Sequence, residues 1–134
     1  RIIDFSKCKL NTLESIKNQS YQNLQVIIID DGSTDGSHRI ISDFIKDDSR
    51  FYLLHQDNAG VAAARTKCLQ YVEGEYLIFS DADDIVLPDA YQYLVEEAIT
   101  KDSDILVLGG AVALSGIFEI LYCKYRVFKD KMLK

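Results

Sequence analysis

Two groups of aspartates follow apolar runs of the chain and could bind a ligand together with a metal ion. They are Asp30 and Asp31, and then Asp81, Asp83 and Asp84. Five carboxylates at one edge would repel each other, so a positive partner is expected. Few basic residues lie in the neighbouring loops, and Arg65 is the best candidate. Carboxylate oxygens are hard ligands, which favours Mg²⁺ or Mn²⁺ shared with a diphosphate.

The spacing of Asp81 and Asp83 strengthens the metal hypothesis. At the end of a strand, residues i and i+2 point to the same side, so both carboxylates can address one ion or its waters. Asp35 and Asp89 are interpreted differently, as residues that cap helices and turns. His38 and His55 have no metal-ligand spacing and adjoin no nucleophile motif. Both histidines are therefore predicted to be non-catalytic.

The acids must be positioned by strands that alternate with helices. Apolar runs predict strands at 26–29, 51–54, 76–79 and 105–108. Helical spacing of apolar residues predicts a helix before the first strand and a helix between each two successive strands. Gly74 is predicted to be the C-cap of the third helix, and Pro88 is predicted to lie in the first turn of the fourth helix. This order indicates an α/β fold with a mostly parallel sheet. The continuous run Val26–Ile29 predicts a central strand buried on both faces. Ligands of such sheets bind at the carboxyl edge, where the acids stand.

Composition narrows the possible classes of protein. The chain has 134 residues, 48% of them hydrophobic, and a formal net charge of −6. This charge argues against binding to the phosphate backbone of nucleic acid. Three widely spaced cysteines indicate neither a disulfide framework nor a zinc site, which favours a reducing compartment. No secretory signal is expected at the start of the chain. The uncharged stretch Ile105–Phe118 is too short to span a bilayer, so it is predicted to form a strand and a turn.

Four segments carry a resemblance to a known family. They are Ser15–Tyr21, Val26–Ser37 (VIIIDDGSTDGS), Gln56–Arg65 (QDNAGVAAAR) and Gly74–Pro88 (GEYLIFSDADDIVLP). The second closely resembles the nucleotide-binding strand and loop of family 2 glycosyltransferases, whose fold is called GT-A. The others resemble, in the same order, the helix end before that strand, the N-x-G-x-x-x-A-R segment and the metal-binding D-x-D region. The resemblance covers about residues 12 to 109.

The resemblance implies a role for each matching residue. Asp31 matches the acid that hydrogen-bonds the nucleobase, typically uracil, and Asp30 supports the same loop. Arg65 matches a basic residue near the nucleotide. Asp81 matches an acid close to the ribose and the metal ion, and Asp83 matches the metal ligand itself.

The implied activity is transfer of a sugar from a nucleoside-diphosphate sugar, typically a UDP-sugar, to a hydroxyl, normally with inversion. Mn²⁺ or Mg²⁺ would neutralise the diphosphate leaving group, with Asp84 assisting the metal shell. Similar enzymes act in bacterial polysaccharide and cell-surface glycan synthesis. A cytoplasmic location at the inner face of the membrane, peripheral membrane association and a glycan or lipid-linked acceptor are expected on the same ground. The sequence does not indicate an oligomeric state.

The chain departs from the family pattern in several places. Residues 1–110 are interpreted as the nucleotide-sugar-binding core, with a first strand that is degenerate or missing because Arg1–Ser6 has no P-x-Y-N-like turn. Thr66 stands where the family usually has Asn. Residues 111–134 are interpreted as the start of the acceptor side. Glu119 is a poor match to the catalytic base, so no catalytic residue is assigned.

Two other functions use similar acids. A phosphatase of the haloacid dehalogenase type would use Asp81 as nucleophile and Asp83 as acid-base. That family places its D-x-D on the first strand, whereas here it follows the third. A receiver-type signalling module would bind Mg²⁺ with its acids, but it needs a lysine where Leu108 and Gly109 stand. A nucleotide-binding module without catalysis is a further alternative.

Overall fold

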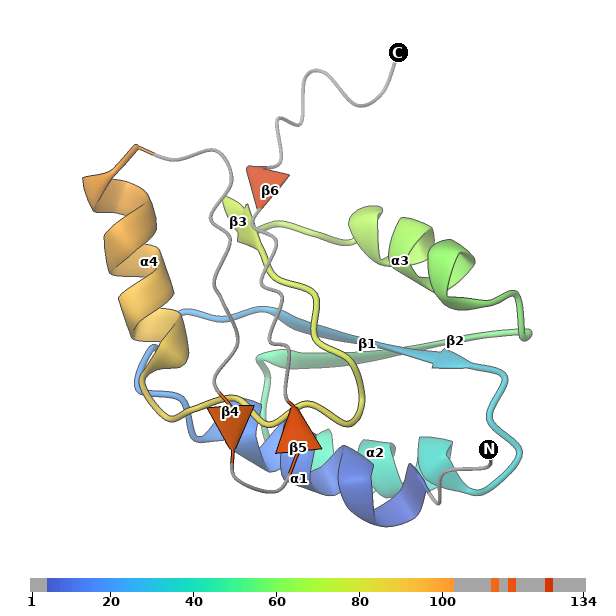
Figure 1. The fold of residues 1–134 in the computed structure, drawn as a ribbon. Helices are drawn as coiled ribbons and strands as arrows, with labels where there is room; N and C mark the ends of the chain where they lie inside the picture. Colours follow the sequence, from blue (N-terminus) through green and yellow to red (C-terminus); the bar gives the residue numbers. More distant parts are fainter. Residues whose placement is uncertain (1–4, 103–111, 114–115, 118–124, 127–134) are drawn as a thin grey trace. The chain divides into compact units, whose positions relative to one another are not determined.

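The computed structural model describes residues 5–102, 112–113, 116–117 and 125–126 (Figure 1). Its elements, in chain order, are α1 (Phe5–Lys17), β1 (Val26–Asp31), α2 (Ser37–Ile45), β2 (Phe51–Gln56), α3 (Val61–Leu69), β3 (Tyr76–Leu77), α4 (Ala90–Thr100), β4 (Val112–Ala113), β5 (Gly116–Ile117) and β6 (Tyr125–Arg126). The four predicted helices are confirmed, as are the first two predicted strands. The fourth predicted strand, 105–108, and the predicted boundary at residue 110 lie outside the described residues. Within the described part of the chain, no helix has the length and apolar character needed to cross a bilayer.

The chain forms two compact units. The first contains Arg1–Asn11 and Asn23–Glu73, and the second contains Thr12–Gln22 and Gly74–Lys134. Buried apolar residues of the first unit include Ile41, Phe51, Cys68 and Val72. Those of the second unit include Leu13, Ile16, Leu77, Val86, Tyr91, Leu94 and Ala98. Each of the two units therefore has apolar side chains withdrawn from water.

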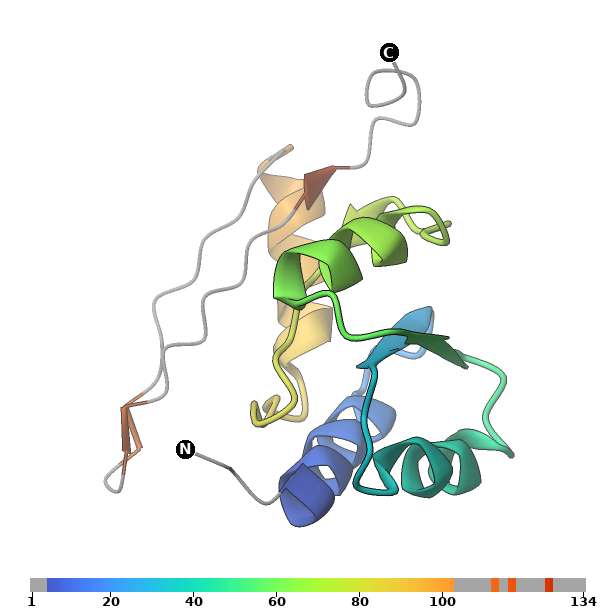
Figure 2. The same ribbon diagram turned by 90° about the vertical axis from the view of Figure 1, so that its right-hand side faces the viewer.

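The first unit is built on a parallel strand pair. β1 and β2 run in register from Val26 opposite Phe51 to Asp31 opposite Gln56. Helix α2 makes the crossover between them, as a parallel connection requires. Figures 1 and 2 show α2 and α3 on opposite faces of this pair. Both strands extend beyond their apolar runs, so the aspartate pair is the end of β1 and not a loop.

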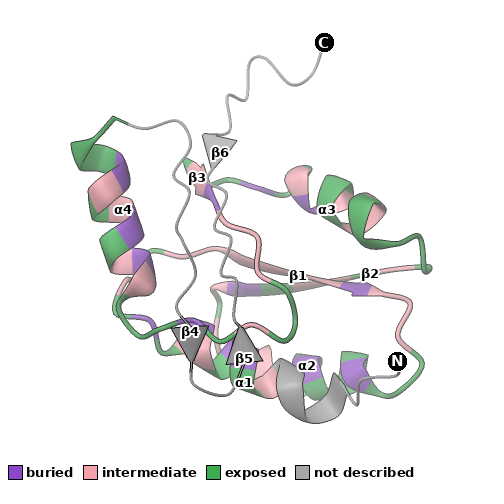
Figure 3. Cartoon of the chain, viewed as in Figure 1, coloured by how far each residue is buried: buried purple, intermediate pink, exposed green. Residues whose placement is uncertain are grey.

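The prediction that β1 is buried on both faces is wrong for the described structure. Val26–Ile29 are half-buried, and Asp30 is the buried residue of the strand (Figure 3). Among the described residues β1 pairs with β2 alone. A parallel strand is buried on both faces only when neighbouring strands and helices cover it.

Three helix and strand ends differ from the predictions. Helix α3 ends at Leu69 with Gln70 as its C-cap, before Gly74. The backbone N–H groups of Gln70 and Tyr71 donate to carbonyls three residues earlier in the chain, which tightens the last turn of the helix. Helix α4 begins at Ala90, and Pro88 lies in a turn closed by a hydrogen bond from the Ala90 N–H to the Leu87 carbonyl at 3.0 Å. β3 is limited to two residues and pairs antiparallel with β6.

A buried glutamine ties α1 to the segment before α4 in the second unit. The side chain of Gln19 is 1% exposed. Its Nε2 donates to the carbonyls of Leu87 at 2.7 Å and Ser15 at 3.0 Å, and its Oε1 accepts the Tyr91 N–H at 3.1 Å. The Gln19 side-chain amide therefore forms hydrogen bonds with the backbone of α1 and with the backbone before and at the start of α4.

Replacing Gln19 with Leu is expected to lower the free energy of unfolding by about 2 kcal/mol, because the buried N–H of Tyr91 loses the acceptor that the Gln19 side chain provides. Urea unfolding measures the effect. Gln92→Leu is the matched control, since the side-chain amide of Gln92 donates to Glu96 on the surface of α4, and its cost is expected below about 0.5 kcal/mol. Equal losses in the two variants would contradict this role for Gln19.

Candidate active site

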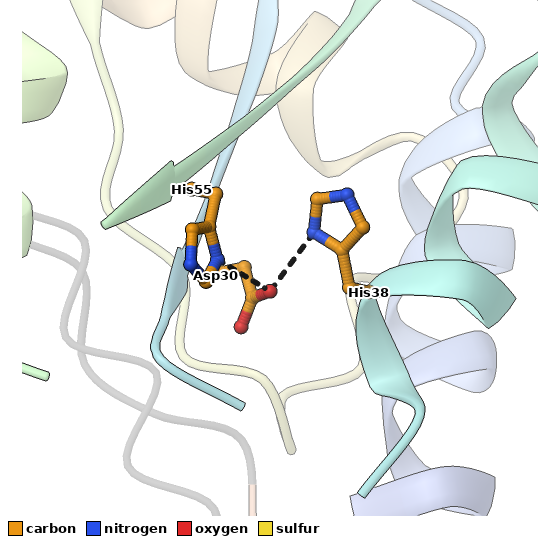
Figure 4. Close-up of side chains that lie close together, drawn as sticks. All are labelled: Asp30, His38 and His55. Carbon is orange, nitrogen blue, oxygen red and sulfur yellow. Dashed lines mark hydrogen bonds and ion pairs between the residues drawn. The ribbon is translucent and has the colours of Figure 1, made fainter. Parts of the chain in front are cut away.

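The carboxyl end of β1 carries a buried aspartate with three hydrogen-bonded neighbours. Asp30 is 4% exposed. Its Oδ1 accepts the backbone N–H of Ser33 at 3.0 Å, and its Oδ2 lies 2.9 Å from Nδ1 of His38 and 3.1 Å from Nδ1 of His55 (Figure 4). His38 comes from the first turn of α2, and His55 from β2 directly opposite Asp30. One carboxylate thus joins β1, β2 and α2.

This environment favours the ionised form of Asp30. Burial by itself would raise its pKa, but the hydrogen bonds from Ser33, His55 and His38 outweigh burial and hold the pKa well below its ordinary value. A carboxyl whose folded pKa is depressed stabilises the fold above its unfolded pKa, near 4, and loses that contribution as the pH falls. The cluster should therefore weaken in acid.

We expect the free energy of unfolding to fall between pH 5 and pH 3, and to fall less in Asp30→Asn, because the amide has no proton to gain. Urea unfolding at both pH values, with a chelator present, measures the difference. Asp47→Asn, a change of an exposed acid in the same unit, should keep the wild-type pH dependence. The same acid sensitivity in wild type and Asp30→Asn would refute this expectation.

Asp31, the last residue of β1, ties the strand to the start of α3. Its Oδ1 accepts the Ala59 N–H at 2.9 Å and the Gln56 side-chain amide at 2.7 Å, and its Oδ2 accepts the Gly60 N–H at 2.9 Å. Hydrogen bonds from Ala59 first, then from Gln56 and Gly60, lower the pKa of Asp31. The half-buried carboxylate therefore stays ionised and organises the loop at residues 57–60.

The loops that follow β1 and β2 approach each other closely at Gly32. A Cβ at this position would lie 2.7 Å from the backbone nitrogen of Asn58, and the φ angle of Gly32 is +73°. Only glycine combines this angle with so near a neighbour. The loops that follow β1 and β2 therefore lie against each other at the carboxyl ends of the two strands, at Gly32 and Asn58.

Arg65 lies exposed on α3 in the same unit. Gly60, whose N–H Asp31 accepts, precedes the first residue of that helix, so the contact to Asp31 also fixes the beginning of α3. The structure therefore brings the predicted residues Asp30, Asp31 and Arg65 into one unit.

The second acid group lies in the loop between β3 and α4, in the second unit. Asp81 and Asp83 are exposed, and Asp84 is half-buried. The Oδ2 of Asp84 accepts the Asp81 N–H at 2.8 Å, and the Asp84 N–H donates to the Asp81 carbonyl at 3.1 Å. Asp84 therefore closes the turn that displays Asp81 and Asp83; its predicted assistance to the metal shell stays a prediction.

A polar face of α1 holds this loop. Thr12 Oγ1 donates to the Ala82 carbonyl at 2.8 Å, and Ser15 Oγ accepts the Val86 N–H at 3.0 Å. Gln19, two residues after the end of α1, adds its bonds to Leu87 and Tyr91 on either side of Pro88. Residues three to four apart lie on one side of a helix, so Thr12 and Ser15 both contact the backbone of this loop. The apolar spacing that predicts α1 does not reveal this polar face.

The histidines were also missed. Among the described residues, Asp30, His38 and His55 form a group that could hold a metal ion, with all ligand atoms within 4.8 Å of one another. The three positions are far apart in sequence and acquire their proximity from strand register and from the start of α2. The available signal was that Asp30 and His55 each come just after the apolar run of one of two neighbouring parallel strands.

Comparison with known proteins agrees with this arrangement of elements. The family model described as glycosyl transferase family 2 matches residues 10–130. Glycosyltransferase GlyG of Streptococcus pneumoniae is 37% identical over 107 residues, which is 79% of this chain and 36% of GlyG. An uncharacterized glycosyltransferase of Escherichia coli, YibD, is 39% identical over 102 residues, 76% of this chain and 28% of YibD. The chain thus spans about a third of the length of these relatives.

The fold has a solved counterpart. The mannosyltransferase PcManGT from Pyrobaculum calidifontis, solved with GDP-mannose and Mn²⁺, superposes with a TM-score of 0.73 over 93% of this chain and 42% of its own. At 17% identity this likeness concerns the fold, and it confirms the predicted GT-A class. From the family model and the sequence relatives together, the chain belongs to glycosyl transferase family 2.

Proposed function

We propose that the chain forms the donor-binding part of an enzyme that transfers a sugar from a nucleoside-diphosphate sugar to a hydroxyl acceptor. The observation that carries the proposal is the family match across residues 10–130, which includes both acid segments. The donor is a UDP-sugar in this proposal, and transfer proceeds with inversion. Family membership disfavours the phosphatase and the receiver module, whose acids would need another fold.

The first unit would hold the nucleoside. Asp31 ends β1 with an ionised carboxylate whose remaining lone pairs can accept the N–H of a uracil ring. Its bonds to Ala59 and Gly60 keep it in place before the donor arrives, which lowers the cost of binding. Asp30 and Ser33 fix the turn beyond it, and Arg65 offers a positive charge to the nucleotide.

The second unit would hold the metal ion. Asp81 and Asp83 are exposed carboxylates in a turn closed by Asp84, a donor set that fits a hard divalent cation such as Mn²⁺ or Mg²⁺. When bound, such an ion supplies neutralisation of the negative charge that develops on the diphosphate. Thr12 and Ser15 keep the backbone of this loop in place, so the two carboxylates need little reorganisation to bind.

The proposal also includes the class of acceptor that receives the sugar. A glycan or a lipid-linked sugar at the inner face of the membrane, in bacterial polysaccharide or cell-surface glycan synthesis, suits the bacterial glycosyltransferases to which the chain is similar. Peripheral membrane association would bring the enzyme to a lipid-linked acceptor.

A thermal-shift panel tests the donor. UDP-glucose, UDP-galactose, UDP-N-acetylglucosamine and GDP-mannose are compared with and without Mn²⁺, because a ligand that binds the native state raises its melting temperature by mass action. We expect UDP-sugars to stabilise the protein, and to do so more strongly with Mn²⁺. Stabilisation by GDP-mannose alone would overturn the choice of base, and stabilisation by none would count against donor binding.

A further inference from the structure

The Asp30 cluster has the composition of a transition-metal site. Asp30, His38 and His55 contribute one carboxylate and two imidazoles from β1, α2 and β2 (Figure 4). Both ring nitrogens that face the carboxylate are Nδ1 atoms, and both approach the same oxygen, Oδ2, at 2.9 and 3.1 Å. Without a metal ion these contacts are hydrogen bonds from two Nδ1–H groups.

The distances also fit three ligands of one cation. Zn²⁺ binds nitrogen and oxygen at about 2.0–2.2 Å, which places neighbouring ligand atoms about 3.0–3.5 Å apart. The separations of 2.9 and 3.1 Å therefore need small adjustments for an ion to replace the two Nδ1 protons. All three ligand atoms lie within 4.8 Å of one another.

The exposure of the three side chains and the hydrogen bond from Ser33 to Asp30 also favour metal binding by this cluster. The Asp30 side chain is 1% exposed, whereas those of His38 and His55 are 50% and 52% exposed, so an ion can reach the cluster from solvent. The second oxygen of Asp30 accepts the Ser33 N–H, which fixes the orientation of the carboxylate. Such a bond to a ligating carboxylate is a regular feature of protein metal sites.

The ligand set distinguishes this cluster from Asp81 and Asp83. Imidazole suits Zn²⁺, Ni²⁺ and related ions, whereas carboxylate oxygens suit Mg²⁺ and Mn²⁺. We propose that Asp30, His38 and His55 bind one transition-metal dication of the Zn²⁺ class, with solvent completing its coordination. The ion cross-links β1, β2 and the first turn of α2 beside Asp31. This inference does not depend on the sugar or the donor.

Zn²⁺ titration against a chromophoric competitor tests the proposal in the whole chain, under reducing conditions and without nucleotide. We expect one Zn²⁺ per wild-type chain and no displacement by millimolar Mg²⁺. His38→Gln and His55→Gln should each lose at least about 100-fold in affinity, since even outer-contact changes cost 10–100-fold. Asp43→Asn, which removes an exposed acid from α2 away from the cluster, should bind as the wild type does.

Circular dichroism establishes that the two exposed histidine variants fold. Co²⁺ substitution of the wild type gives a second measurement that needs no variant: we expect visible absorption typical of nitrogen and oxygen ligands. A strong thiolate band would assign the ion to a cysteine and overturn the proposal. Equal Zn²⁺ affinity in all variants, or no Zn²⁺ binding by the wild type, would overturn it as well. Loss of donor binding alone leaves these results unaffected, so the two proposals fail separately.

Discussion

Asp83→Asn is expected to lower sugar transfer by about 10²–10³-fold, the usual effect of removing one electrostatic group that stabilises a transition state. The side chain lies exposed in the turn closed by Asp84, and neutralising it removes one of the two carboxylates proposed to hold the metal ion. Because the amide keeps the size of the side chain, the loop should retain its fold. Initial rates measured across a Mn²⁺ titration report the effect.

The matched control for this prediction is Asp89→Asn. Asp89 is an exposed acid in the same connection, at the N-cap of α4, and its side chain makes no capping hydrogen bond. Its neutralisation should leave the rate and the Mn²⁺ dependence close to those of the wild type. If Asp83→Asn keeps the wild-type rate and metal dependence, Asp83 is not a ligand of the catalytic metal ion.

Asp31→Asn is expected to weaken UDP binding by about 10²-fold or more. The carboxylate accepts two backbone N–H groups and one side-chain amide, and an asparagine would turn its own NH₂ group toward at least one of these donors. Loss of charge-assisted hydrogen bonds of this kind costs about 1.5–3 kcal/mol each. Calorimetry with UDP measures the affinity, and hydrogen exchange at Ala59 and Gly60 should show faster exchange in the variant.

The two readouts separate the two roles of Asp31. Asp57→Asn, a change of an exposed acid in the same loop, should alter neither the exchange of these amides nor the UDP affinity. Faster exchange in Asp31→Asn with unchanged UDP affinity would leave Asp31 as an anchor of the loop and refute its contact with the base.

Local sequence patterns predicted the helices and the β1–β2 crossover because each is decided by short-range spacing. The run Val26–Ile29 is apolar without interruption, and the apolar residues of α2 repeat at helical spacing. The burial of β1 was not predictable in the same way, since it depends on which strands and helices cover it. The end of α3 before Gly74 likewise depends on how its last turn closes.

The site was predictable where a residue type and a strand end coincide. The acids Asp30 and Asp31 follow an apolar run, and their place at the carboxyl end of β1 follows from parallel pairing. His55 meets Asp30 only through strand register, and His38 only through the turn that starts α2. Helical periodicity separates apolar from polar faces, but it does not reveal that the polar side chains of Thr12 and Ser15 bind a loop.

The proposed function requires that the metal ion assigned to Asp83 strengthens the binding of the nucleotide whose base is assigned to Asp31. Calorimetric titration of wild type and Asp83→Asn with UDP, in the presence and absence of Mn²⁺, tests this most directly. Mn²⁺ should tighten UDP binding by the wild type, and Asp83→Asn should bind UDP equally with and without the ion. UDP binding by the wild type that is the same with and without Mn²⁺ would contradict this dependence of nucleotide binding on the metal ion.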